Sequence, residues 1–313
     1  MRNLLYVVLA SLVVLTSCDK VENPVPSVVI EPDFPGILYP HGDSAHYYAN
    51  YYTPFTANTN VDRNVLIEDF TGHTCNFCPA AAEEAKFISD ANSGRVFVSS
   101  VHAGPNGTGT LQELNSSAGY NTIFYNETTD ELGNYFGSQW IGSLFSGNPW
   151  GTISRNSDET GTPTQGPQDW DNSTTTLLST NDLKVNLQAQ LNYFPSTRGV
   201  FLHVEADNIG AVTNELRIVV QLHEDSLVAP QKLNDNSTDL NYVHHDILRA
   251  TLDNKTFGQE LDSIHKDATN GKYYYNYVYE LPLEYAADNA HLLIYIRDAV
   301  TEEIYHVIEQ HID

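Results

Sequence analysis

Two cysteines three positions apart, Cys75 and Cys78, separate an apolar stretch of the sequence from an alanine-rich one. The stretch before them, VLIEDF at 65–70, is a short apolar run of the kind that forms a buried strand. The stretch after them, PAAAEEAKFISDA at 79–91, begins with proline and carries glutamates early, as the first turn of a helix does. A second apolar run follows at 95–101. This order predicts an α/β layer domain in which the cysteine pair opens a helix.

The position of the pair favours thiol–disulfide exchange. A thiol at the positive end of a helix is more easily ionised, so we expect Cys75 to attack and Cys78 to resolve the mixed disulfide. A zinc site is the first alternative; His73 and His102 could serve as further ligands, but no second pair has ligand spacing. The other alternative is a permanent disulfide, although so small a loop gains little from closure. No metal is predicted, and no cofactor beyond the dithiol.

Two further residues occur in the order found in thioredoxin-like proteins, which this part of the chain resembles. Asp69 lies six residues before Cys75, and Pro149 directly precedes an apolar stretch. The resemblance implies that Asp69 is a buried acid that carries the proton of the resolving thiol. It also implies a cis bond at Pro149, which leaves the backbone of Asn148 to line a substrate groove. His73 either adds a positive charge near Cys75 or is a solvated loop histidine.

The N-terminus has the pattern of a bacterial lipoprotein signal. Arg2 precedes an apolar run at 4–15, which is shorter than the ~20 residues of a membrane span. The run ends in LTSC, and cleavage before Cys18 would leave a cysteine for acylation and stable membrane anchoring. An ordinary cleaved signal or a short N-terminal anchor is the alternative. Cys75 and Cys78 would then be the remaining cysteines, outside the cytoplasm, where disulfides persist.

The charge balance excludes some partners. With 15 basic and 40 acidic residues, the formal net charge is -25. Such a field repels nucleic acid and anionic membrane surfaces. The expected partners are therefore the membrane through acylated Cys18, and a protein substrate or surface partner.

The hydrophobic period changes to two beyond residue 183, where apolar and polar residues alternate in six or seven stretches separated by turns. This pattern predicts an immunoglobulin-like β-sandwich. The polar stretch at 156–176 reads as a linker or long loop. We therefore expect a signal peptide at 1–17, a tether and tyrosine-rich lead-in at 18–60, an α/β thioredoxin-like domain at 61–176 and the all-β sandwich at 177–313. The tyrosines of the lead-in are expected to pack onto the next domain.

Three segments, VLIEDFTGHTCNFCPAA, GNPWGTISR and YVHHDILRATLDNKTFGQEL, resemble the lipoprotein family named after a twenty-eight-kilodalton outer membrane protein. The resemblance runs from about residue 64 to the C-terminus. It implies a thioredoxin-like domain joined to a β-sandwich and attachment to the outer membrane, but no particular activity. Asp19, directly after the lipidated cysteine, retains lipoproteins in the inner membrane of enteric bacteria, so that membrane is the alternative.

Two hypotheses follow. In the first, the thioredoxin-like domain exchanges disulfides with extracytoplasmic proteins. In the second, the chain is a surface adhesion or scaffold protein whose β-sandwich binds a partner and whose cysteines are vestigial. A solvent-reachable cysteine pair would favour the first hypothesis, and a pair buried under the tyrosine-rich lead-in would favour the second.

Overall fold

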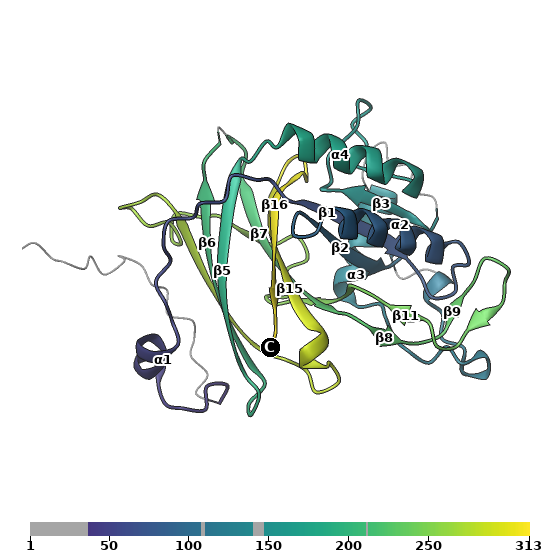
Figure 1. The fold of residues 1–313 in the computed structure, drawn as a ribbon, viewed down its shortest axis with the longest axis horizontal. Coiled ribbons are helices and arrows are strands. Elements are labelled where there is room, and N and C mark those ends of the chain that lie inside the picture. Colours follow the sequence, from purple (N-terminus) through teal and green to yellow (C-terminus); the bar gives the residue numbers. More distant parts are fainter. Residues whose placement is uncertain (1–36, 108–109, 140–146, 211) are drawn as a thin grey trace, which may run out of the picture.

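The computed structural model describes residues 37–313 except 108–109, 140–146 and 211, so the expected signal peptide and Cys18 lie outside the described residues. Within this part of the chain the strands form a nine-stranded sheet, a three-stranded sheet and two short pairs (Figure 1). The nine-stranded sheet has the order β16-β15-β7-β12-β2-β1-β3-β4, with β13 paired to β7. Its strands are β1 (Val65–Thr71), β2 (Val96–His102), β3 (Trp150–Ile153), β4 (Thr164–Gln165), β7 (Leu216–Glu224), β12 (Ile247–Thr251), β13 (Gln259–Glu260), β15 (Ala290–Asp298) and β16 (Ile304–His311).

The remaining elements cover these strands or extend from them. The three-stranded antiparallel sheet consists of β5 (Val185–Phe194), β6 (Gly199–Asn208) and β14 (Tyr273–Glu280). The short pairs consist of β8 (Leu227–Val228) with β11 (Val243–His244), and β9 (Gln231–Lys232) with β10 (Thr238–Asp239). The α-helices are α1 (Ser44–Asn50), α2 (Cys78–Ala91), α3 (Glu127–Asn134) and α4 (Trp170–Thr180). Single turns of other helix types are η1 (Thr110–Gln112), η2 (Ser116–Ala118), η3 (Tyr135–Gln139), η4 (Pro167–Asp169) and η5 (Ala287–Asn289).

The unit β1-α2-β2 confirms the predicted strand, helix and strand. Strand β1 is buried throughout and pairs in parallel with β2. Helix α2 buries Ala81, Ala85 and Ile88, whose spacing places them on one face. The expectation that Cys75 opens the helix is wrong, because α2 begins at Cys78. Proline suits the first turn of a helix, so Pro79 sets the start and leaves Cys75 in the preceding turn.

The linker expected at 156–176 is also wrong, because this stretch contains β4 and the beginning of α4. Trp170, Thr174 and Leu177 are the buried residues of α4, at helical spacing on one face. The Trp170 ring packs against Gly151 of β3, where an added Cβ would lie 2.6 Å from the ring. The polar composition of this stretch predicts a loop, but the burial of Trp170 against β3 stabilises a helix there.

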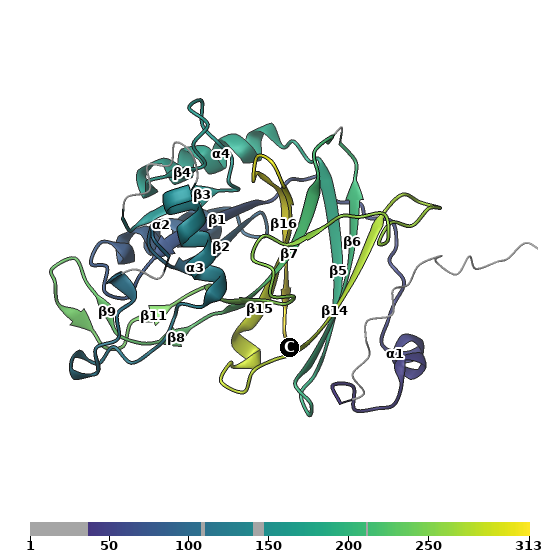
Figure 2. The same ribbon diagram turned by 180° about the vertical axis from the view of Figure 1, so that it is seen from behind.

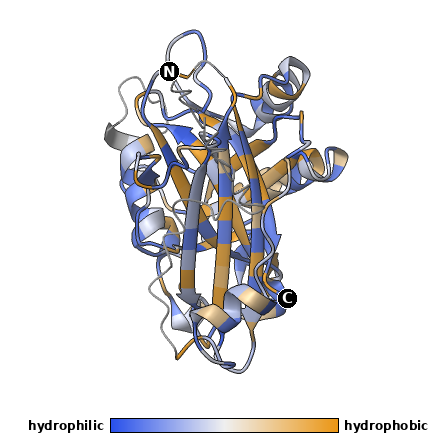
Figure 3. Cartoon of the chain, turned by 90° about the vertical axis from the view of Figure 1, so that its left-hand side faces the viewer, coloured by the Kyte–Doolittle hydropathy of each residue, from blue (hydrophilic) through white to orange (hydrophobic). Residues whose placement is uncertain are grey.

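The predicted alternating strands beyond residue 183 are confirmed as β5, β6, β7, β14, β15 and β16. Their apolar residues form the largest core cluster, which lies between the three-stranded sheet and the strands β7, β15 and β16. The side view in Figure 3 shows polar and apolar residues alternating along the long strands. Strand β12 pairs with β2 in parallel at Ile247 and Ser100, so one hydrogen-bonded sheet contains strands from both predicted domains (Figure 2). The division at residue 176 stays a prediction.

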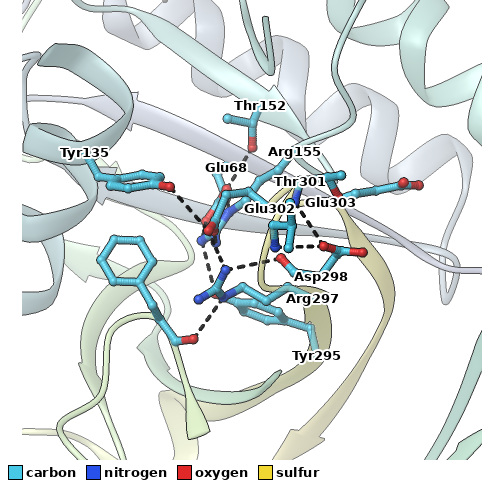
Figure 4. A network of polar contacts seen from close by, with 12 residues as sticks. Glu68, Tyr135, Thr152, Arg155, Tyr295, Arg297, Asp298, Thr301, Glu302 and Glu303 are labelled. Carbon is cyan, nitrogen blue, oxygen red and sulfur yellow. Dashed lines mark hydrogen bonds and ion pairs between the residues drawn. The ribbon is translucent and has the colours of Figure 1, made fainter. Parts of the chain in front are cut away.

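A buried ionic network joins the two ends of this sheet (Figure 4). The guanidinium of Arg155 lies 2.6 Å from Glu68 of β1 and 3.4 Å from Glu302 of the turn between β15 and β16. Arg297 of β15 also pairs with Glu302. Strand β16 therefore approaches β1, far from it in the strand order, and the backbone N–H of Ile304 donates to the carbonyl of Ser154 at 2.7 Å. The sheet curls so that the two halves of the chain share one polar core.

The tyrosine-rich lead-in packs onto the second half of the chain. Tyr47 of α1 is fully buried in a cluster with Phe194 of β5 and Phe201 of β6. Its hydroxyl hydrogen-bonds to His203 of β6 at 2.7 Å. The expectation that these tyrosines pack onto the next domain is wrong, because strands β5 and β6 carry the aromatic side chains that they contact.

Candidate functional site

Cys75 and Cys78 form a disulfide between the end of β1 and the start of α2, with their Cα atoms 5.4 Å apart. Both cysteines are buried. Cys75 is 3% exposed and Cys78 is 1% exposed. Phe77, which lies between them in the sequence, is exposed at the surface. The two cysteines are not.

The cover comes from residues 227–244, which we call the covering segment; it connects β7 to β12 and contains β8 to β11 (Figure 1). The side-chain amide of Gln231 donates to the carbonyl of Cys75 at 2.9 Å and to that of Gly72 at 3.3 Å. The backbone N–H of Lys232 donates to the carbonyl of His73 at 2.9 Å. The pair is therefore buried under a segment of the second half of the chain, and not under the tyrosine-rich lead-in.

A second segment holds the residues before the cysteines. The side-chain amide of Gln112 donates to the carbonyl of Thr71 at 2.6 Å, and the imidazole of His73 bonds to the carbonyl of Glu113 at 3.0 Å. The buried His73 ring also contacts Tyr120 and Phe124. Burial lowers the pKa of His73, so at neutral pH it brings no positive charge to Cys75.

Asp69 lies on β1, directly beneath the loop that carries the cysteines. Its side chain is 1% exposed, and no hydrogen-bond partner is found for Oδ1 within the described part of the chain. Burial in this apolar strand raises the pKa of Asp69 from 3.8 to about 8. The carboxyl group is therefore largely protonated at neutral pH and can both donate and accept a proton.

A cavity of about 200 Å³ connects Asp69 with Cys78. His102, Tyr242 and His244 are among the other residues that line it. His102 ends β2, whereas the other two belong to the covering segment. Sequence reasoning considered His102 only as a zinc ligand, and it assigned no role to the other two. No periodic pattern connects residues so far apart, so only the fold could bring them together.

Three histidines line the cavity, and two of them, His102 and His244, are uncharged at neutral pH, whereas the hydrogen bond to Asp225 raises the pKa of the third, His245. Burial, with the neighbouring His244, lowers the pKa of His102 well below its usual value. Burial lowers the pKa of His244 to about 4. Phe124 lies between them, stacked on His102 with 4.4 Å between ring centroids. Nδ1 of His102 and Nε2 of His244 have no hydrogen-bond partner among the described residues.

Pro149 and Asn148 lie beside the same loop. Their peptide bond is cis. Trp150, the next residue, pairs with Phe70 of β1, so Pro149 lies at the end of β1 where the cysteine loop begins. The side-chain amide of Asn148 donates to the carbonyls of Thr71 at 2.6 Å and Ala103 at 2.9 Å. The fold thus brings Asp69, the two cysteines, Pro149 and Asn148 to one end of the sheet.

Metal binding has no support in this geometry. Among the described residues, no group of three or more His, Cys, Asp or Glu side chains is arranged to hold a metal ion. What the arrangement offers is a reducible disulfide beside a buried acid whose pKa lies near physiological pH. Proton transfer coupled to thiol–disulfide exchange needs these two groups.

The fold and the N-terminal pattern define an α/β protein of the bacterial envelope with a buried disulfide site. The chain belongs to the family of the outer membrane protein Omp28, whose family model matches residues 138–313, more than half of the chain. The matched part includes Pro149 and the covering segment, while the cysteine pair lies before it. The predicted outer membrane location is confirmed by this membership. No helix in the described part of the chain has the length and apolar character of a membrane span.

Two solved structures from Porphyromonas gingivalis are similar to the chain. HBP35 matches with a TM-score of 0.61 and 15% identity, over 82% of this chain and 77% of that one, which shows a common fold. A domain of the outer membrane lipoprotein Omp28 matches with a TM-score of 0.29 and 22% identity, over 42% of this chain and 90% of that one. Among curated proteins, none matches the sequence.

Proposed function

We propose that this outer membrane lipoprotein carries out thiol–disulfide exchange through Cys75 and Cys78, with Asp69 as the group that accepts and returns the proton. The observation that carries the proposal is the buried carboxyl of Asp69 in the same cavity as Cys78, with no hydrogen-bond partner for Oδ1 among the described residues. Leaving a buried polar group without a partner costs about 1–3 kcal/mol. A disulfide that only held the chain together would need no such group beside it.

The finer description of the fold belongs to the same proposal. A thioredoxin-like unit at 61–176 is supported by β1-α2-β2, by the cysteines between strand and helix, and by the cis bond before β3. An immunoglobulin-like sandwich at 177–313 is supported by the three-stranded sheet packed against β7, β15 and β16.

Exchange with an extracytoplasmic protein requires the covering segment to move. The three hydrogen bonds from Gln231 and Lys232 hold it over the loop of Cys75. Each such bond contributes about 1 kcal/mol, so freeing the loop of Cys75 from Gln231 and Lys232 alone costs less than unfolding the protein. The backbone beside the cis bond of Asn148 and Pro149 is the place where an extended partner would bind.

One observation favours a second function. Both sulfurs are almost completely buried, as expected of a binding protein in which the disulfide is vestigial and the β-sandwich holds a partner. The two functions predict different redox chemistry for the same pair, so one measurement separates them.

The test is the reduction potential of Cys75–Cys78 in the full-length protein in detergent, equilibrated against thiol–disulfide buffers. A value between about -270 and -120 mV is expected, because exchange catalysts lie in that range. The Cys75→Ser variant should then lose activity in an exchange assay with a protein substrate. A value well below about -300 mV would show a structural disulfide and would leave the binding protein as the function.

A further inference from the structure

The cavity beside the disulfide reaches the two sulfurs unequally. Of the described residues that line it, Cys78 is one and Cys75 is not. Gln231, which also lines the cavity, donates its side-chain amide to the carbonyl of Cys75. In this closed arrangement, the cavity offers a route to the disulfide that leads to Cys78.

The size of the cavity limits what can enter. A cavity of about 150 Å³ holds a molecule the size of benzene. The volume here is about 200 Å³, so an aliphatic thiol of a few carbon atoms fits. A tripeptide thiol such as glutathione is too large to enter, and a protein segment is larger still.

The lining suits a small molecule with a polar body. Asp69 Oδ1, His102 Nδ1 and His244 Nε2 all belong to buried side chains of this cavity and have no hydrogen-bond partner among the described residues. Glu83 and Lys86, both exposed on α2, also line it with opposite charges, so the lining carries no strong field of one sign. Hydrogen-bonding groups are thus available to a ligand that brings a hydroxyl, an amine or a thiol.

We propose that a low-molecular-weight aliphatic thiol enters this cavity and reduces the disulfide by attacking Sγ of Cys78, with Cys75 as the leaving group. The proposal rests on the proposed exchange function and names the substrate class and the sulfur attacked. The sequence predicts that Cys75 reacts first and that Cys78 resolves the mixed disulfide. In the proposed route, a small thiol from solution reacts first with Cys78.

The steps balance as follows. The first thiol reacts as its thiolate, after losing its proton to solvent; its sulfur bonds to Sγ of Cys78, and the electron pair of the broken S–S bond goes to Cys75. A second molecule of the thiol passes its proton to the Cys75 thiolate and attacks the sulfur of the first. The products are the symmetrical small disulfide and the Cys78 thiol, which takes the proton of the neutral Asp69 carboxyl; Asp69 then regains a proton from solvent. Two small thiols are oxidised and the protein disulfide is reduced.

The first experiment uses the oxidised full-length protein in detergent, treated with cysteamine and quenched with acid. Fragmentation mass spectrometry should find the cysteamine adduct on Cys78, and an adduct on Cys75 would overturn the proposal. The outcome does not depend on the reduction potential, so a failure of the exchange function can be told apart from a failure of this route.

The second experiment compares single-cysteine variants. Methyl methanethiosulfonate should modify Cys78 in Cys75→Ser about tenfold faster than Cys75 in Cys78→Ser, because reactivity follows access. Ala82→Leu, which fills the cavity from α2, should slow the modification of Cys78, while Ala80→Leu on the exposed face of the helix should not. Faster modification of Cys75, or no effect of Ala82→Leu in a variant with unchanged melting temperature, would refute the route.

Discussion

Replacing Asp69 with asparagine should make the protein more stable at neutral and alkaline pH and should change the pH dependence of its stability. The folded protein holds this carboxyl protonated up to a pKa of about 8, whereas its ordinary value is 3.8. Because the folded pKa is the higher one, the folded state binds a proton that the unfolded state has lost. The stability contributed by the neutral carboxyl is therefore complete below about pH 4 and decreases until about pH 8.

The magnitude follows from the two pKa values. Each pH unit between them corresponds to 1.36 kcal/mol, so the wild type should lose about 4 kcal/mol relative to Asp69→Asn between pH 4 and pH 7. The side chain is almost fully buried, so solvent does not screen this effect. The absolute effect of the amide on packing is the same at every pH and cancels in the slope.

The assay is urea unfolding of the oxidised full-length proteins in detergent, at intervals from pH 4 to pH 9. The buried histidines titrate alike in both proteins, so the difference between wild type and variant isolates Asp69. Asp171→Asn removes the charge of an exposed aspartate in the first turn of α4; it serves as the control and should change the difference by less than about 1 kcal/mol. An equally small change for Asp69→Asn would refute the raised pKa and the proton-transfer role that depends on it.

Two further substitutions test the cover and the buried network. Gln231→Ala removes the amide bonded to Cys75 and Gly72, and should increase the rate at which a bulky maleimide modifies the reduced protein about tenfold. Lys232→Ala, which keeps the backbone hydrogen bond to His73, is the control. Equal rates of maleimide modification in the two variants would show that Gln231 does not hold the covering segment closed. Arg155→Met leaves Glu68 buried without its partner, and should lower the free energy of unfolding in urea by about 3–5 kcal/mol. Lys86→Met breaks an exposed pair and should cost less than about 1 kcal/mol; a similar loss in both variants would contradict the importance of burial.

Local features could be predicted because neighbouring residues decide them. The apolar run of β1, the proline at the start of α2 and the alternating strands beyond residue 183 each carry their own periodic or positional signal. The cis bond at Pro149 was implied by the resemblance to thioredoxin-like proteins and is present. Helix α4 had a signal too, in the spacing of Trp170, Thr174 and Leu177, but the polar residues between them concealed it.

The position of Asp69 in the site was implied by the sequence, whereas its environment was not. Asp69 lies six residues before Cys75 in the sequence. Its pKa depends on how completely the rest of the chain excludes water, which no local pattern states. Burial by neighbours distant in the sequence therefore turns an ordinary carboxyl into an acid near physiological pH.

The cover over the disulfide was decided entirely by the tertiary structure. Gln231 bonds to Cys75 across 156 positions of the chain, and the same segment brings His244 to the cavity that His102 enters from β2. The parallel pairing of β12 with β2 places this segment over the cysteines, because the connection from β7 to β12 must pass the end of the sheet where they lie. The sequence by itself determined the elements and the cysteine motif, since these depend on periodicity and on residues a few positions apart. Contacts between distant segments decide which of the two cysteines lines the cavity, and only the packed fold creates these contacts.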